Sequence, residues 1–153
     1  MSFLDRKKED AYTIIIGCGR LGANLANELS ESGSNVLIMD SDKSSFRKLS
    51  SAYGGLAVEA DGTDFAALKE AEIEKADAVV AVTNNDNVNI MAAQIARYVF
   101  NVKHVIARLY DPERECVYKE LEIDTICPAV LSSKEIDRIL DKFRAQERNE
   151  VAA

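Results

Sequence analysis

AYTIIIGCGRLG, residues 11–22, is the stretch of the sequence that decides the fold. Its apolar half, residues 11–16, is typical of a buried strand, and a glycine-rich turn follows it directly. Gly17 permits a sharp exit from the strand, Gly19 lets the backbone approach a pyrophosphate, and Gly22 lets a helix pack close to the sheet. Phosphates on such a turn lie at the helix N-terminus, where free N–H groups and the helix dipole attract anions. The stretch therefore predicts a phosphate-binding turn between a strand and a helix.

An acidic residue ends the next apolar run, Val36-Leu37-Ile38-Met39-Asp40. Asp40 follows the turn by about 20 residues, the separation at which a carboxylate accepts hydrogen bonds from both hydroxyls of an adenosine ribose. The same carboxylate would repel a 2′-phosphate, and the next residues, Ser41 and Asp42, offer no arginine to neutralise it. We therefore expect NAD(H), AMP, ADP or ATP as the ligand, with the choice among them open, and disfavour NADP. The competing interpretation is a strand–turn–helix that binds no ligand.

Strand and helix patterns alternate along the rest of the chain, which is typical of a parallel sheet with helices on both faces. We predict an α/β fold: a Rossmann-like, doubly wound sheet of six parallel strands in the order 3-2-1-4-5-6, followed by a C-terminal helix. The predicted strands are residues 12–17, 35–40, 56–59, 78–83, 104–109 and 124–127. The predicted helices are residues 20–32, 43–53, 65–71, 113–121 and 132–148, with a long one that ends near Val99.

The chain divides into three predicted parts. These are an N-terminal extension over residues 1–10, a nucleotide-binding domain over residues 11–131, and a charged amphipathic helix with its tail over residues 132–153. Two helices of the domain carry apolar residues at the spacing of one helical face. We expect the second of these stripes to lie in the core. The first stripe is Leu21, Leu25 and Leu29, and the second is Val88, Met91, Ala92, Ile95 and Val99.

In an open parallel sheet, ligands lie above the carboxyl ends of the strands, near the point where the strand order reverses. Polar residues at the predicted strand ends should therefore converge on one crevice. Arg20 and Arg108 each offer a phosphate a two-pronged guanidinium. The alternatives are a solvated side chain for Arg20 and an ion pair for Arg108. The candidate ligand-binding residues are Gly17, Cys18, Gly19, Arg20, Leu21, Gly22, Asp40, Ser41, Asp61, Gly62, Thr83, Asn84 and Arg108.

Several of these residues have more than one possible role. Asn84 and Asn85 can contact a ribose or cap the following helix, and the cap is the safer prediction. Cys18 occupies a variable position of the turn, where we interpret it as a small buried thiol rather than a redox sensor. Arg20 is hypothesised to bind a terminal phosphate that AMP lacks.

The composition describes a folded, acidic chain of ordinary domain size. Its 153 residues are 47% apolar and 29% charged, and the net charge is −7. An acidic surface argues against DNA or RNA as a partner, because nucleic-acid binding depends on basic side chains that displace counterions. The sequence shows no run of about 18 apolar residues and no apolar signal core, so we expect a cytoplasmic protein without direct membrane insertion. Three scattered cysteines and one histidine predict no metal site.

No motif of a known catalytic centre is present. The sequence lacks a GxSxG elbow, an HExxH helix and a Walker loop, and His104 stands at the start of a predicted strand, away from the ligand crevice. A dehydrogenase would need a second region to hold its substrate. We therefore predict a nucleotide-sensing binding module and not an enzyme. The alternatives are an NAD-dependent oxidoreductase subunit whose substrate domain is on another chain, and a nucleotide-binding scaffold.

Taken together, these segments resemble the TrkA-N family, the potassium-transport nucleotide-binding (KTN) domain that forms the N-terminal part of RCK modules. The resemblance covers about residues 12–131 and depends on the motifs jointly. One departure is Ala60-Asp61-Gly62, where the family more often has Gly-Asp-Ala. The matching residues are Gly17 to Gly22, Val36 to Asp40, Asp61 to Asp64, Ala76 and Asp77, Ala81 to Asn84, Asp86, Asn89, and Ile106 to Arg108.

The resemblance implies a cytoplasmic regulatory subunit, held at the membrane through its partner, that binds NAD(H) or an adenine nucleotide and controls a membrane potassium transporter or channel. It also implies a homodimer or a larger ring, in which the charged terminal helix suits the crossover between neighbours. By the same resemblance, Gly17 to Leu21 hold phosphates, Asp40 holds the adenosine ribose, Asp61 and Gly62 lie on the adenine side, and Thr83, Asn84 and Arg108 lie on the far side of the ligand.

Overall fold

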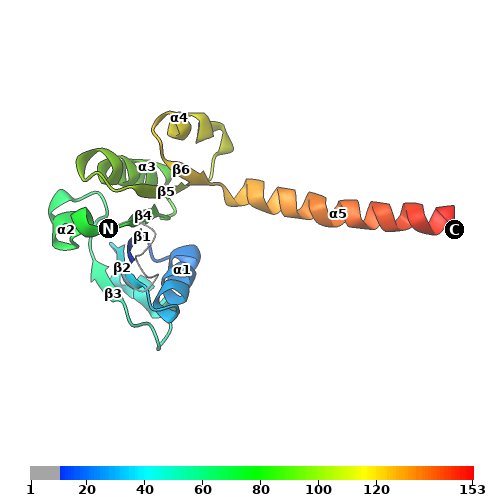
Figure 1. Ribbon diagram of the computed structural model, residues 1–153. Coiled ribbons are helices and arrows are strands. Elements are labelled where there is room, and N and C mark those ends of the chain that lie inside the picture. Colours follow the sequence, from blue (N-terminus) through cyan, green and yellow to red (C-terminus); the bar gives the residue numbers. More distant parts are fainter. Residues whose placement is uncertain (1–10) are drawn as a thin grey trace, which may run out of the picture.

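The computed structural model describes residues 11–153, so the predicted extension over residues 1–10 lies outside the described residues. Its strands are β1 (Tyr12–Ile16), β2 (Asn35–Asp40), β3 (Leu56–Glu59), β4 (Ala78–Ala81), β5 (His104–Arg108) and β6 (Asp124–Ile126). They form one parallel sheet in the order β3-β2-β1-β4-β5-β6, which confirms the predicted topology. The strand order reverses between β1 and β4, in the middle of the sheet (Figure 1).

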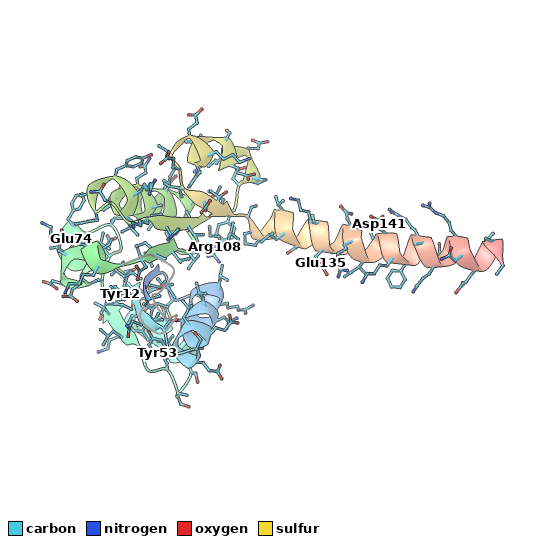
Figure 2. The ribbon with its side chains drawn as sticks, viewed as in Figure 1. Tyr12, Tyr53, Glu74, Arg108, Glu135 and Asp141 are labelled. Atoms are coloured by element: carbon cyan, nitrogen blue, oxygen red, sulfur yellow. The ribbon has the colours of Figure 1, made fainter. Side chains whose placement is uncertain are left out.

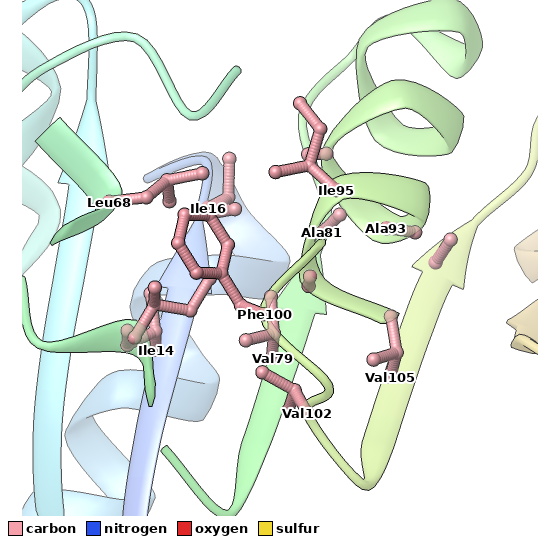
Figure 3. Packing of buried hydrophobic residues seen from close by; sticks show 14 of the residues in the cluster. Ile14, Ile16, Leu68, Val79, Ala81, Ala93, Ile95, Phe100, Val102 and Val105 are labelled. Atoms are coloured by element: carbon pink, nitrogen blue, oxygen red, sulfur yellow. The ribbon is translucent and has the colours of Figure 1, made fainter. Parts of the chain in front are cut away.

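Helices cover both faces of this sheet. They are α1 (Arg20–Glu31), α2 (Phe65–Glu70), α3 (Asp86–Gln94), α4 (Glu115–Glu120) and α5 (Pro128–Ala152), with the 3₁₀ helices η3 (Lys43–Lys48), η4 (Ile73–Lys75) and η6 (Pro112–Arg114) and the π-helix η5 (Ile95–Val99). Successive residues of β1 point to opposite faces. Ile15 packs with Ala26 of α1, whereas Ile14 and Ile16 belong to the cluster that contains Leu68 of α2 (Figure 3).

The helices bury smaller side chains than the sequence predicts. In the second stripe, Met91 and Val99 are 54% and 52% exposed, so the prediction that they lie in the core is wrong, whereas Ala92 and Ile95 are buried as predicted. In the first stripe, Leu21 is 36% exposed. The large strand side chains already fill the space above the sheet, and only small residues let the helices approach it closely. The buried residues are Gly22, Ala23 and Ala26 in α1, and Asn89, Ala92, Ala93, Ile95 and Ala96 in α3 and η5.

Two helix boundaries also differ from the prediction. The predicted helix over residues 43–53 is the 3₁₀ helix η3, which ends at Lys48. The Ser50 N–H donates to Asn27 Oδ1 of α1 (2.9 Å), and Ser50 Oγ accepts from the Ala52 N–H (3.1 Å). After η3 these backbone N–H groups therefore bind side chains and not the carbonyl oxygens of a preceding helical turn. The last helix begins at Pro128 instead of residue 132, because proline suits the first helical position, where its missing N–H costs nothing.

α5 extends away from the body of the domain as a single helix (Figure 1). None of its residues is buried, and the side chains of Ile136 and Phe143 are each 57% exposed. Ion pairs along its surface include the side chains of Glu135 and Asp141, which Figure 2 labels. Within residues 11–153, no helix is both long and apolar enough to cross a membrane.

Candidate functional site

A cavity of about 540 Å³ opens at the carboxyl ends of the central strands, within the roughly 300–1,000 Å³ that small-molecule sites span. It lies where the strand order reverses between β1 and β4, as an open parallel sheet predicts. Arg20, Leu21 and Gly22 do not line it. The predicted residues that do line it are Gly17, Cys18, Gly19, Asp40, Ser41, Asp61, Gly62, Thr83, Asn84 and Arg108.

The glycine turn joins β1 to α1 beneath this cavity. Gly17 has φ = +106°, and a Cβ there would lie 2.8 Å from the backbone nitrogen of Thr83, so the turn requires glycine. A Cβ on Gly22 would overlap the carbonyl oxygen of Gly17, so a glycine at position 22 is required for α1 to lie this close to the turn. Gly19 precedes α1, and a Cβ there would meet nothing within 4 Å. The backbone at Gly19 is therefore open to an anion at the start of the helix.

Asp40 ties the end of β2 to the glycine turn. Its Oδ2 accepts a hydrogen bond from the Cys18 N–H (2.8 Å), and its Oδ1 accepts one from the Asp42 N–H (2.8 Å). Each carboxylate oxygen has a further lone pair, so Asp40 can still accept from the hydroxyls of a ribose.

Cys18 is fully buried, and its thiol lies 3.5 Å from the carbonyl oxygen of Ser45. Burial, and then the nearby Asp40 carboxylate, raise the pKa of the Cys18 thiol above its usual value, while Lys48 opposes this shift. A raised pKa keeps the sulfur protonated, whereas redox-active cysteines have a lowered pKa. The structure therefore agrees with the buried-thiol interpretation.

Two further carboxylates of the cavity are fixed by hydrogen bonds within their own turns. Asp61 Oδ1 accepts from the N–H (2.8 Å) and the hydroxyl (2.7 Å) of Thr63, and these bonds lower the pKa of Asp61. Asp42 Oδ1 accepts from the hydroxyl (2.7 Å) and the N–H (2.9 Å) of Ser44, and these bonds lower the pKa of Asp42. Both carboxyl groups are therefore ionised at neutral pH, which makes this side of the cavity negative.

Asn89 joins the ends of β4 and β5 on the other side of the cavity. Its side chain is fully buried in α3. Its Oδ1 accepts from the N–H (2.8 Å) and the hydroxyl (2.6 Å) of Thr83, and its Nδ2 donates to the carbonyl oxygens of Thr83 (3.0 Å) and Arg108 (3.1 Å). The predicted helix cap is also present, since Asn85 Oδ1 accepts from two N–H groups of the first turn of α3. Asn84 lines the cavity instead.

Arg108, which Figure 2 labels, is the last residue of β5 and lines the cavity. Its Nη2 donates to the carbonyl oxygen of Thr83 (2.7 Å), and its guanidinium carbon lies 5.0 Å from the centre of the Tyr110 ring. Among the described residues it forms no ion pair with a carboxylate, so the alternative role considered for Arg108 is not realised.

Three cavity residues on η3 and its N-cap are absent from the predicted site. Asp42, Ser45 and Lys48 all line the cavity, and Lys48 Nζ lies 3.4 Å from the carbonyl oxygen of Cys18. Their spacing of three residues places them on one edge of a 3₁₀ helix, which has about three residues per turn. In an α-helix the same three residues would spread around the helix axis. Because an α-helix is predicted over residues 43–53, the sequence does not indicate that they share one edge.

Gly62→Ala is expected to lower the free energy of unfolding by about 1–3 kcal/mol, because the added Cβ would overlap Cγ2 of the buried, β-branched Ile16. Urea unfolding measures the loss. Gly54→Ala is the matched control: its Cβ would meet only Ser30 Oγ at 3.5 Å, an ordinary contact, so the stability should change by less than about 0.5 kcal/mol. Equal stability of the two variants would contradict the close approach of Gly62 to β1.

Comparison with known proteins gives a consistent family assignment. The TrkA-N domain model matches residues 13–128. The chain is 47% identical over 115 residues to the Trk system potassium uptake protein TrkA of Streptomyces coelicolor, and covers 52% of that protein. It is 33% identical over 126 residues to a TrkA homolog of Pyrococcus abyssi, and covers 56% of it. These alignments include 75% and 82% of this chain, which thus spans about half the length of the relatives.

Solved structures share the fold. The chain superposes on GsuK bound to ADP with a TM-score of 0.73 at 22% identity, covering 89% of this chain and 35% of that one. The Shewanella denitrificans Kef CTD in its AMP-bound form gives a TM-score of 0.69 at 18% identity, covering 89% and 92%. The family model extends over most of the described domain, from β1 to the start of α5. The chain belongs to the TrkA-N domain family.

Proposed function

We propose that this chain is a regulatory nucleotide-binding domain of a potassium-transport system. The observation that carries the proposal is the cavity itself, in which the carboxylate of Asp40 and the open backbone at Gly19 face the same space. The names of the relatives, which are Trk potassium uptake proteins, support the connection to potassium. Because the chain spans only about half of those relatives, the activity of the whole protein belongs to the proposal.

The proposed ligand is NAD(H) or an adenine nucleotide. Asp40 would accept the ribose hydroxyls, and the turn at Gly19 would hold the phosphates against the start of α1. Among proteins with the same fold, GsuK binds ADP and NAD and the Kef CTD binds AMP, which supports this class. The ionised carboxyl groups of Asp42 and Asp61, together with Asp40, line the cavity and disfavour the additional 2′-phosphate of NADP.

The proposed partner is a membrane potassium transporter or channel subunit, with this chain at the cytoplasmic surface of the membrane. A homodimer or larger ring would transmit the signal. The exposed apolar residues of α5, including Ile136 and Phe143, suit a helix that joins neighbouring copies. A nucleotide regulates such an assembly only if it binds one of its shapes more tightly than another, since equal affinity shifts no population.

Mass spectrometry of the purified chain under native conditions tests this function directly. We expect an adenine nucleotide or NAD(H) to remain bound, and calorimetry with AMP, ADP, ATP, NADH and NADPH to show the weakest binding for NADPH. Binding of none of these ligands would overturn the proposal. Co-purification of the full-length protein with a membrane potassium transporter tests the partner. Consumption of NADH with a carbonyl substrate would instead support the oxidoreductase alternative.

A further inference from the structure

One basic side chain of η3 reaches the nucleotide cavity. The basic residues of this 3₁₀ helix are Lys43, Arg47 and Lys48, and of these only Lys48 lines the cavity. It shares one edge of the helix with Asp42 and Ser45, which line the cavity as well. Lys48 stands outside the motifs that this chain shares with the TrkA-N family, so its role has to follow from its own contacts.

Lys48 and Asp40 contact opposite ends of the same residue, Cys18. The Cys18 N–H donates to Asp40 Oδ2 (2.8 Å), and Lys48 Nζ donates to the Cys18 carbonyl oxygen (3.4 Å). Both charges act on the Cys18 thiol, since burial and then Asp40 raise its pKa and Lys48 lowers it. Nevertheless, Lys48 forms no ion pair with a carboxylate within residues 11–153. An ammonium group and a carboxylate therefore lie near the same residue of the glycine turn without contacting each other.

The ammonium group of Lys48 has donors to spare. One of its three N–H groups binds the Cys18 carbonyl oxygen at 3.4 Å, which is longer than the roughly 2.7–3.2 Å of most such bonds. The other two have no acceptor in the part of the chain that the structure describes, and the side chain is exposed to water. A ligand can therefore bind these donors without displacing a contact of the protein.

The charges around Lys48 favour a sugar hydroxyl over a phosphate. The carboxylates that line the cavity are Asp40, Asp42 and Asp61, and all three follow β2 or β3, as Lys48 does. One cation beside three carboxylates leaves a negative surface, which repels a phosphate and tolerates a neutral hydroxyl. A hydroxyl can donate one hydrogen bond and accept two, so it can bind a carboxylate and an ammonium group at once.

We propose that Lys48 is a specificity-determining residue, which donates a hydrogen bond to a ribose hydroxyl that Asp40 also binds. This inference rests on the proposed nucleotide-binding function. The hydroxyl donates to the carboxylate and accepts from the ammonium group, and such linked hydrogen bonds strengthen one another. The site thereby recognises ribose through a pair of opposite charges, and it prefers ribonucleotides to their deoxy analogues.

Calorimetry on the full chain with ADP, 2′-deoxy-ADP and 3′-deoxy-ADP tests the proposal. Lys48→Met is expected to weaken ADP binding about tenfold, because a hydrogen bond from a charged donor is lost. The analogue that lacks the hydroxyl bound by Lys48 should lose less than about twofold, since the variant removes no contact from it. Arg47→Met is the matched control. It removes the same charge from the neighbouring exposed position, which does not line the cavity, and should change all three affinities by less than about twofold.

The other outcomes overturn defined claims. Equal losses for all three ligands would show that Lys48 acts on the phosphates or on the glycine turn, and no loss would show that it contacts only water. Either result overturns this proposal and leaves nucleotide binding intact. If the unsubstituted chain did not bind ADP, this proposal would fail, and only if AMP, ATP and NADH also failed to bind would the proposed function fail with it.

The Lys48→Met variant is expected to fold, which circular dichroism checks. Lys48 is exposed, and its one hydrogen bond is the long contact with the Cys18 carbonyl oxygen. Lys48→Gln keeps a donor for this carbonyl group and removes the charge. If Lys48→Met does not fold, the affinities of Lys48→Gln decide by the same criterion.

Discussion

Asp40→Ala is expected to weaken the binding of adenine nucleotides about 100-fold or more. The variant loses two hydrogen bonds from ribose hydroxyls to a charged acceptor, each worth roughly 1.5–3 kcal/mol, and about 1.4 kcal/mol corresponds to a tenfold change in affinity. It also loses the acceptor of the Cys18 N–H, which holds the glycine turn against β2. The loss of the ribose hydrogen bonds and the loosening of the glycine turn both lower the affinity, because the turn is the proposed phosphate site.

Titration calorimetry of the variant with ADP measures this loss, and circular dichroism shows whether the fold is retained. Glu59→Gln is the matched control. Glu59 pairs with Asp40 in the register of β3 on β2, carries the same charge, and does not line the cavity. The affinity of the Glu59→Gln variant for ADP should stay within about twofold of that of the unsubstituted chain. Undiminished binding by Asp40→Ala would place the ribose elsewhere and remove the main support for the proposed function.

The topology was predictable because its signals are local and strong. A central parallel strand is buried on both faces, so it appears in the sequence as a continuous apolar run, as Ile14, Ile15 and Ile16 do. The strand order then follows from the glycine turn after the first strand and the alternation of elements. Because ligands bind at the carboxyl ends of the strands, the same order predicts the residues that line the cavity at the ends of β1, β2, β4 and β5.

The remaining errors concern the rotation and type of the helices. The stripe on α3 and η5 predicts a core position for Met91 and Val99, yet both side chains are exposed. No local pattern indicates how close a helix lies to its sheet. Lys48 was missed because η3 has a 3₁₀ period. Arg20 does not line the cavity, because its side-chain direction depends on how the first turn of α1 meets the cavity, and its contact with a phosphate stays a prediction. These features are set by tertiary contacts.

Asn89→Leu is expected to lower the free energy of unfolding by about 2–4 kcal/mol, and the melting temperature by on the order of 10 °C. Asn89 has the right position for an apolar helix face, but its amide makes four hydrogen bonds to the ends of β4 and β5. A leucine has the same branched shape and the same number of heavy atoms, but it is larger and makes none of these hydrogen bonds. The buried N–H of Thr83 would then lose its acceptor, which is the principal cost.

Thermal and urea unfolding measure this loss, with Asn87→Ala as the control on the same helix. Asn87 is exposed and accepts one hydrogen bond, from Arg114, so its replacement should change the stability by less than about 0.5 kcal/mol. The asparagine at position 89 also fixes the carbonyl group to which Arg108 binds, and Asn89→Leu should therefore weaken ADP binding in addition to stability. A variant as stable as the parent chain would mean that Thr83 and Arg108 do not depend on Asn89, and that the junction of β4 and β5 is held by the sheet alone.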